Sequence, residues 1–85
     1  MPERKIKDHE IVVAFENGKH VCRPTRTTAR VGDTIFWSGV GEVRFKGKSP
    51  FNEGLGPFRP GSRQEATRTG TFPFEGVEGD IEIKD

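Results

Sequence analysis

Residues 21–37, VCRPTRTTARVGDTIFW, decide the fold class that the sequence predicts. Together with Ser38, the segment ends in TIFWS, whose consecutive large apolar side chains predict a central strand buried on both faces, or nearly so. Gly32-Asp33 is typical of a turn, and the threonine-rich residues 25–30 before it are typical of an extended strand. Pro24 donates no ladder hydrogen bond, so it marks an edge position or the end of regular pairing. This stretch therefore predicts two strands joined by a turn.

Upstream of this stretch the sequence predicts a β-hairpin. Residues 10–15 (EIVVAF) form a short apolar run, and Asn17-Gly18 follows at the spacing of a two-residue type I′ turn. The return strand covers residues 19–23. This turn places Glu16 opposite Lys19, Phe15 opposite His20 and Val13 opposite Cys22.

Downstream, short strands surround a long loop. Val43 and Phe45 alternate with Arg44 and Lys46, which predicts a strand over residues 42–46. The loop that follows, residues 47–62, contains four glycines and three prolines and has no periodic pattern. Three further strands are expected, over residues 62–69, 71–74 and 79–84. The predicted core includes Val31, Ile35, Trp37, Ile81 and Ile83.

The composition favours an all-β domain of six to eight strands with no significant helix. Seven Phe, eleven Gly and six Pro occur among 85 residues, so aromatic side chains and turn residues are plentiful. The single cysteine excludes an internal disulfide. The length predicts one domain over residues 1–85, and residues 1–8 are expected to be a flexible N-terminus.

The N-terminal sequence bears on cellular location. MPERKIKDHE has no apolar segment of the kind found in signal peptides, and the longest apolar run, residues 11–15, is too short to span a bilayer. We therefore expect no membrane partner. The expected location is the cytoplasm by default, or the periplasm if an export signal has been removed.

Two stretches resemble the cupredoxins, the plastocyanin and pseudoazurin class of blue-copper proteins. GTFPF at 70–74 with GDIEI at 79–83 is similar to that family's Gly-Thr-Tyr strand and last strand. Residues 21–37 resemble its second and third strands, with the matching positions Val21, Cys22, Pro24, Gly32, Asp33, Thr34, Ile35 and Trp37. The resemblance implies a Greek-key β-sandwich or small barrel.

The resemblance also implies a type 1 copper site, with two His, one Cys and a weak axial Met as ligands. The first His would stand at Glu42 or Val43, and the Cys at Gly76. Between that Cys and the last strand the family has a loop with the second His and the Met, but here only Val77 and Glu78 stand there. We therefore expect a cupredoxin-like domain with no copper site and no cofactor.

A relocated metal site is one alternative. His20 and Cys22 share a face of one expected strand, and Glu42 or His9 is a further potential ligand for zinc or copper. This set would belong to a copper-binding or electron-transfer protein with a non-standard site. The opposing interpretation is a buried Cys22 without metal, since free cysteines are among the most buried residues.

Single-stranded nucleic-acid binding is another alternative. Arg44, Lys46 and Lys48 share one face of a strand, and Phe51 and Phe58 lie in the loop that follows. Cations beside exposed aromatic rings suit phosphates and stacked bases. The opposing interpretation is that the apolar loop residues fold back and cap the sandwich.

The sequence predicts a metal-free binding or structural module rather than an enzyme. The glycine pairs in GVGEVR and GLGPFR precede no helix, so they are not dinucleotide motifs. No nucleophile motif occurs. We expect a protein partner, bound at the end of the sandwich where copper would lie. The expected binding surface consists of Arg44, Lys46, Phe51, Leu55, Phe58 and Arg59.

Overall fold

The computed structural model describes residues 5–85, which form eight β-strands. These are β1 (Asp8–Glu16), β2 (Lys19–Arg23), β3 (Arg26–Arg30), β4 (Thr34–Gly39), β5 (Arg44–Phe45), β6 (Arg63–Glu65), β7 (Gly70–Glu75) and β8 (Asp80–Lys84). Among residues 5–85 there is no helix, and thus none long and apolar enough to cross a membrane. The predicted all-β class is confirmed.

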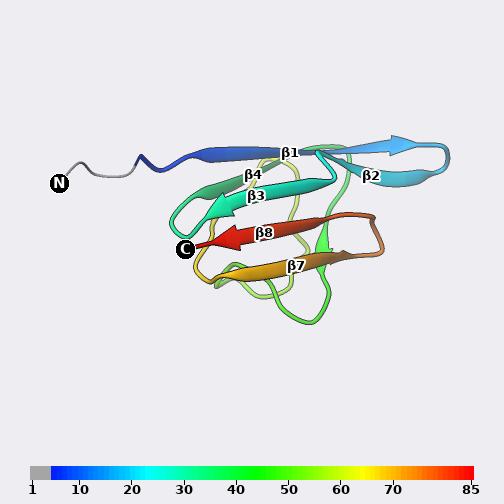
Figure 1. Cartoon of the computed structure of the whole chain (residues 1–85). Coiled ribbons are helices and arrows are strands. Elements are labelled where there is room, and N and C mark those ends of the chain that lie inside the picture. The colour runs from blue at the N-terminus through cyan, green and yellow to red at the C-terminus, as the bar shows by residue number, and fades with distance from the viewer. Residues whose placement is uncertain (1–4) are drawn as a thin grey trace.

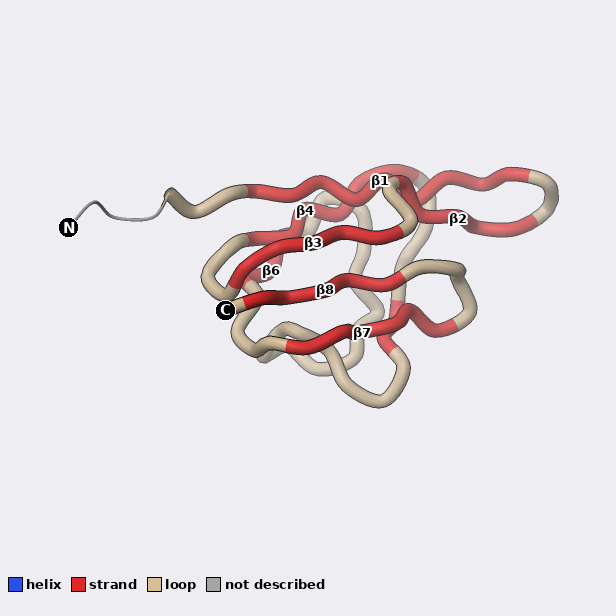
Figure 2. The backbone as a smooth tube through the Cα atoms, in the orientation of Figure 1, coloured by secondary structure: helices blue, strands red, loops and turns tan. Residues whose placement is uncertain are grey.

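The strands form two four-stranded sheets, in the orders β2-β1-β4-β6 and β3-β8-β7-β5. Figure 1 shows the β1–β2 hairpin in one layer and the β7–β8 pair in the other. The β1–β4 and β3–β8 pairs are parallel, and the other pairs are antiparallel. The chain passes from the first sheet to the second between β2 and β3, at Pro24 and Thr25, as the tube in Figure 2 shows. The predicted Greek-key sandwich is confirmed.

The β1–β2 hairpin has the predicted turn and register. Asn17 and Gly18 have positive φ angles of 52° and 79°, which a type I′ turn requires of both central residues. The strand partners include Glu16 with Lys19, Phe15 with His20 and Val13 with Cys22.

Strand β4 lies between β1 and β6, and residues 34–38 alternate between half-buried and buried, so the predicted burial is complete on one face and partial on the other. Ile35 and Trp37 are buried, whereas Phe36 lies on the outer face and is half-buried. The Arg63 guanidinium lies 4.9 Å from the centre of the Phe36 ring. A cation over an aromatic face is a favourable contact, so Phe36 is covered by a neighbouring side chain rather than by a further layer.

Both sheets contribute to one hydrophobic core. Trp37 lies at its centre, with the rings of Phe45, Phe51, Phe58 and Phe74 at centroid distances of 5.9 to 6.5 Å. Ile35, Ile81 and Ile83 are buried as predicted, and Val31 packs against the core from a partly buried position. Aromatic rings thus fill much of the space that a chain with one leucine cannot fill with aliphatic side chains.

The long connection between β5 and β6 is folded back onto the sandwich. Phe51 and Phe58 are 1% and 4% exposed, and Val43 and Phe58 exchange backbone hydrogen bonds of 3.0 and 2.8 Å. The buried Ser49 hydroxyl donates to the Gly54 carbonyl over 2.6 Å. Strand β5 itself contains only two residues, although a strand over residues 42–46 was predicted.

The described N-terminal residues are attached to the sandwich near β4. The Lys7 carbonyl accepts a hydrogen bond from Thr34 N over 2.9 Å, and β1 begins at Asp8. The flexible segment predicted for residues 1–8 includes residues 1–4, which lie outside the described residues.

The β3–β8 pair brings two like charges together. In its register Arg26 lies opposite Asp80 and forms an ion pair of 2.8 Å, whereas Arg30 lies opposite Lys84. Like charges on neighbouring strands destabilise a sheet, and opposite charges contribute about 0.2 to 1 kcal/mol.

Lys84→Glu is therefore expected to raise the free energy of unfolding by about 0.5 to 1 kcal/mol, because it places a carboxylate opposite Arg30. Urea denaturation at low salt measures the difference, which should shrink at high salt. Lys46→Glu, at an exposed position just outside the paired residues of β5, is the charge-reversal control. A Lys84→Glu chain less stable than the natural one would contradict this account of the register.

Candidate functional site

One end of the sandwich is formed by residues 39–46, residues 55–59 of the long loop and the turn 75–79; we call it the loop end. Arg44 and Phe45 lie opposite Glu75 and Phe74, which places β5 beside this turn. Phe74 N donates to the Gly79 carbonyl over 3.0 Å and closes the turn, in which Gly76 has a φ of 78°. At this end Glu42 accepts a hydrogen bond of 3.1 Å from Arg59 Nε, and both side chains are exposed.

The candidate metal ligands are not brought together. Cys22 lies in the core, where burial raises the pKa of its thiol to about 11, so it remains protonated at neutral pH. His20 is exposed, and its ring contacts the Phe15 ring edge-on at 5.1 Å. Glu42 is paired with Arg59. Within residues 5–85, no three His, Cys, Asp or Glu side chains form a group that could hold a metal ion.

Four of the six residues predicted to form the binding surface are exposed, namely Arg44, Lys46, Leu55 and Arg59. The other two, Phe51 and Phe58, are buried against Trp37, so their prediction as exposed contacts is wrong. The reason is that the sandwich has few large aliphatic side chains, and these rings cover its aromatic core. For Phe51 and Phe58 the alternative interpretation, that the loop caps the sandwich, is correct.

The two buried rings hold the tip of the loop in place. Leu55 stands between Phe51 and Phe58 in the chain and is 44% exposed, and its carbonyl accepts a hydrogen bond from Phe45 N over 2.9 Å. The adjacent Gly54 and Gly56 have φ angles of 87° and 107°, which side-chain-bearing residues rarely adopt. An apolar side chain is thus exposed on a loop whose backbone is fixed on both sides.

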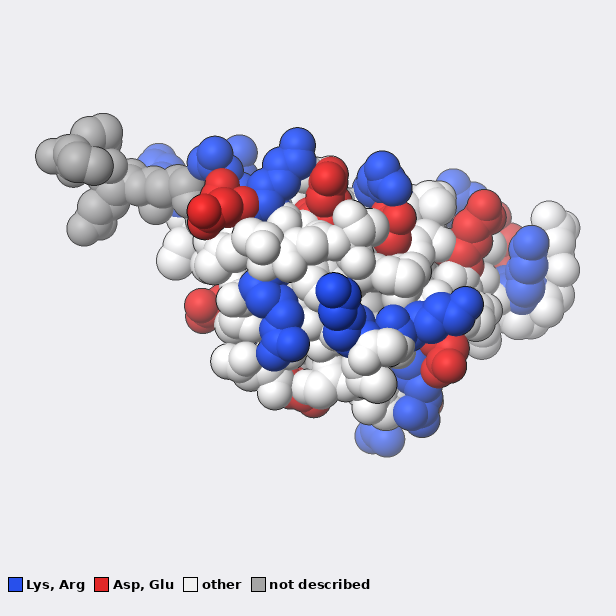
Figure 3. Space-filling model, turned by 60° about the horizontal axis from the view of Figure 1, so that its bottom comes forward, with Lys and Arg blue, Asp and Glu red and all other residues white. Residues whose placement is uncertain are grey.

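The segment that includes β5 carries exposed cations beside this loop. Arg44, Lys46 and Lys48 point outward, because the intervening Val43 and Phe45 are buried. Figure 3 brings the lower side of the molecule in Figure 1 forward and shows blue Lys and Arg side chains predominating over red acidic ones across the lower part of the view. This side of the protein therefore favours a negatively charged partner.

A further exposed apolar residue at the loop end is Val40, which is 67% exposed. Its amide donates to the Val13 carbonyl over 2.8 Å, which fixes the segment beside β1. The next residue, Gly41, lies under the His20 ring, since a Cβ at this position would lie 2.7 Å from His20 Cδ2. The glycines on both sides of Val40 were a signal of this close approach.

Solved structures identify the fold, although sequence comparisons do not. No protein-family model matches the chain, and no curated protein matches its sequence. Among solved structures, pseudoazurin from Methylobacterium extorquens superposes with a TM-score of 0.68 and 15% identity, covering 92% of this chain and 76% of that protein. The fold is cupredoxin-like. A reduced Cu(I) form of a proline-to-glycine variant of amicyanin also matches this cupredoxin-like chain, with a TM-score of 0.56 and 16% identity, covering 87% of this chain and 81% of that protein.

The residues at the loop end of this cupredoxin-like sandwich do not fit a type 1 copper ion. The ligand set implied by the resemblance is two imidazoles, a thiolate and a thioether. The corresponding positions hold Glu42, Gly76, Val77 and Glu78, and the carboxylate of Glu42 is occupied by Arg59. Neither a thiolate nor an imidazole stands at a ligand position, so no electron-transfer step is assigned to this end.

Proposed function

We propose that this cupredoxin-like chain is a non-catalytic protein-binding module that docks an acidic partner surface at the loop end. The observation that carries the proposal is the exposed Leu55 on a loop anchored by Phe51 and Phe58 beside exposed cations. A side chain held in its bound position loses little conformational freedom on association. Leucine beside arginine and lysine combines apolar contact with charge complementarity, which gives affinity and orientation respectively.

The same geometry argues against stacking of nucleic-acid bases on Phe51 and Phe58, the two rings of the predicted binding surface. Base stacking on a protein requires an exposed aromatic face. Phe51 and Phe58 pack edge-on against each other at 5.1 Å inside the core, where Phe51 meets Trp37 edge-on and Phe58 is stacked on Trp37. The exposed cations can instead contact a partner that offers carboxylates and an apolar side chain.

Photo-crosslinking tests the proposal. A photoreactive amino acid at Leu55 should capture an acidic protein from an extract of the native cell, in a form that survives nuclease treatment and is identified by mass spectrometry. The same group at Glu65, which is exposed on β6 opposite Thr34 at the start of β4, should not capture it. Capture of RNA or DNA at Leu55, or equal capture at both positions, would overturn the proposal.

Leu55→Asp is expected to weaken binding of the purified partner at least about tenfold, because it removes the apolar contact and adds a charge of the partner's own sign. Lys46→Glu should weaken it by about fivefold at low salt and less at high salt. Calorimetry measures both dissociation constants. Lys19→Glu is the matched charge-reversal control and should bind like the natural chain.

A further inference from the structure

A cavity of about 360 Å³ lies at the opposite end of the sandwich from the loop end, between the start of β1 and the last residues of β3 and β8. It occupies the open side between the two sheets, where β1 and β3 are neither paired with each other nor covered by a further strand among the described residues. The lining residues are Lys5, Lys7, His9, Thr28, Ala29, Arg30, Asp33 and Lys84.

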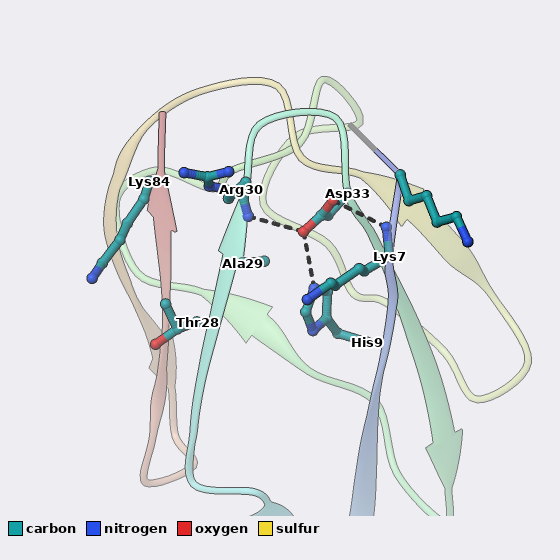
Figure 4. A pocket seen from close by; sticks show the side chains of 8 residues that line it. Lys7, His9, Thr28, Ala29, Arg30, Asp33 and Lys84 are labelled. Carbon is teal, nitrogen blue, oxygen red and sulfur yellow. Dashed lines mark hydrogen bonds and ion pairs between the residues drawn. The ribbon is translucent and has the colours of Figure 1, made fainter. Parts of the chain in front are cut away.

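The inner wall of the cavity is fixed by Asp33, which is 2% exposed. Its Oδ1 accepts a hydrogen bond from Lys7 N over 3.1 Å, and its Oδ2 accepts one from Arg30 N over 3.1 Å. The same Oδ2 lies 3.0 Å from His9 Nε2. Figure 4 shows this carboxylate between β1 and the end of β3. Asp33 thus connects the start of β1 with the end of β3, which form two walls of the cavity.

The cavity is bordered by cations without acidic partners. Among residues 5–85, no ion pair joins Lys5, Lys7, Arg30 or Lys84 to an acid. Arg30 and Lys84 are also direct neighbours across β3 and β8, whereas Arg26 at the other end of the same strands is paired with Asp80. A carboxylate bound beside Arg30 and Lys84 would offset their repulsion.

The cationic side chains do not converge on one point. Figure 4 shows Lys84 on β8 pointing away from Asp33, whereas Lys7 lies across the cavity on β1, beside His9. Several carboxylates spaced along one chain match their separation better than a single phosphate does.

The outer edge of β3 offers backbone groups to such a chain. Val31 N donates to Lys84 O, and Asp80 N donates to Thr25 O, so the odd-numbered residues of this region face β8. Because successive residues of a strand point their backbone groups to opposite sides, Thr28 directs its N–H and C=O away from β8. Thr28 is exposed and lines the cavity. An unpaired strand edge of this kind binds extended peptides by strand addition.

We propose that an extended acidic peptide segment of a partner binds in this cavity, along the outer edge of β3. Its backbone pairs with Thr28, and its carboxylates lie beside Arg30, Lys84 and the lysines of residues 5–7. At about 3.3 Å per residue, four or five residues of such a segment match the length of β3. This site is separate from the loop end and does not depend on the function proposed there.

Titration with the peptide Ac-(Glu-Thr)4-NH2, followed by NMR of the labelled protein, tests the proposal. The Thr28 amide should show the largest shift and should become protected from hydrogen exchange. Lys84→Glu should weaken binding about tenfold, since it replaces an attraction by a repulsion. Lys19→Gln, on the exposed β1–β2 hairpin, should leave the dissociation constant unchanged. A melting curve confirms that each variant is folded, and Lys84→Gln replaces Lys84→Glu if that chain does not fold.

Two further probes separate strand addition from general anion binding. The same peptide N-methylated at every backbone amide, which cannot donate ladder hydrogen bonds in either strand direction, should bind at least about fivefold more weakly. Inorganic phosphate and a dT8 oligonucleotide should not protect the Thr28 amide. Equal binding of the methylated peptide, protection by dT8 or phosphate, or an unchanged affinity in both Lys84 variants would overturn the proposal.

Discussion

Trp37→Ala is expected to lower the free energy of unfolding by about 3 to 5 kcal/mol. The side chain is fully buried, and four phenylalanine rings contact it, two from the facing sheet and two from the long loop. Its indole N–H also donates to Gln64 Oε1 over 2.6 Å, which joins β4 to β6 on the inner side. Alanine would leave a cavity that these rings cannot fill without leaving their rotamers.

Urea denaturation followed by circular dichroism measures this loss, because the variant lacks the chain's single tryptophan as a fluorescent reporter. Trp37→Phe is the matched variant: it keeps an aromatic ring, loses the hydrogen bond to Gln64, and should fall between the natural chain and Trp37→Ala. If Trp37→Ala unfolds at the same urea concentration as the natural chain, the position of β4 in the core is wrong.

Asp33→Ala is expected to cost about 3 kcal/mol, the second largest effect. The carboxylate accepts hydrogen bonds from two backbone amides, those of Lys7 and Arg30, and contacts His9. Hydrogen bonds to a charged acceptor are stronger than neutral ones, and a partly buried amide that loses its acceptor is costly. The loss should appear first as detachment of the start of β1 from the β3–β4 turn.

Amide hydrogen exchange at Lys7 and Arg30, together with urea denaturation, measures the effect. Asp33→Asn retains one acceptor oxygen and should lose clearly less stability than Asp33→Ala. Unchanged protection of both amides in Asp33→Ala would show that the carboxylate does not attach the start of β1 to the β3–β4 turn.

The sequence was most informative where a local signal fixes geometry. Asn17-Gly18 determined both the hairpin turn and its register, and the alternation of Ile81 and Ile83 with charged residues determined the inward face of β8. The cupredoxin-like arrangement was predicted from residues 21–37 and 70–83, because turn residues and apolar positions recur there at the family's spacing.

The candidate sites were less predictable because they depend on contacts between distant segments. Nothing in the sequence around Phe51 and Phe58 distinguishes an anchor from an exposed contact, since the loop has no periodic pattern. The cavity beside Asp33 depends on the parallel β1–β4 and β3–β8 pairs, which join residues far apart in the chain. Leu55 was predicted as part of the binding surface, but the reason that it is exposed became evident only from the burial of Phe51 and Phe58.

The turn between β7 and β8 limits how this chain and the copper proteins could be interconverted. The backbone hydrogen bond from Phe74 to Gly79 closes the turn over four intervening residues, and β7 and β8 pair in register directly behind it. Point substitutions in residues 75–78 change side chains but cannot lengthen the loop to seat two more ligands. The path to a copper protein therefore passes through an insertion, and loop grafting at Gly76 rather than single-site mutagenesis is the engineering route that the strand register permits.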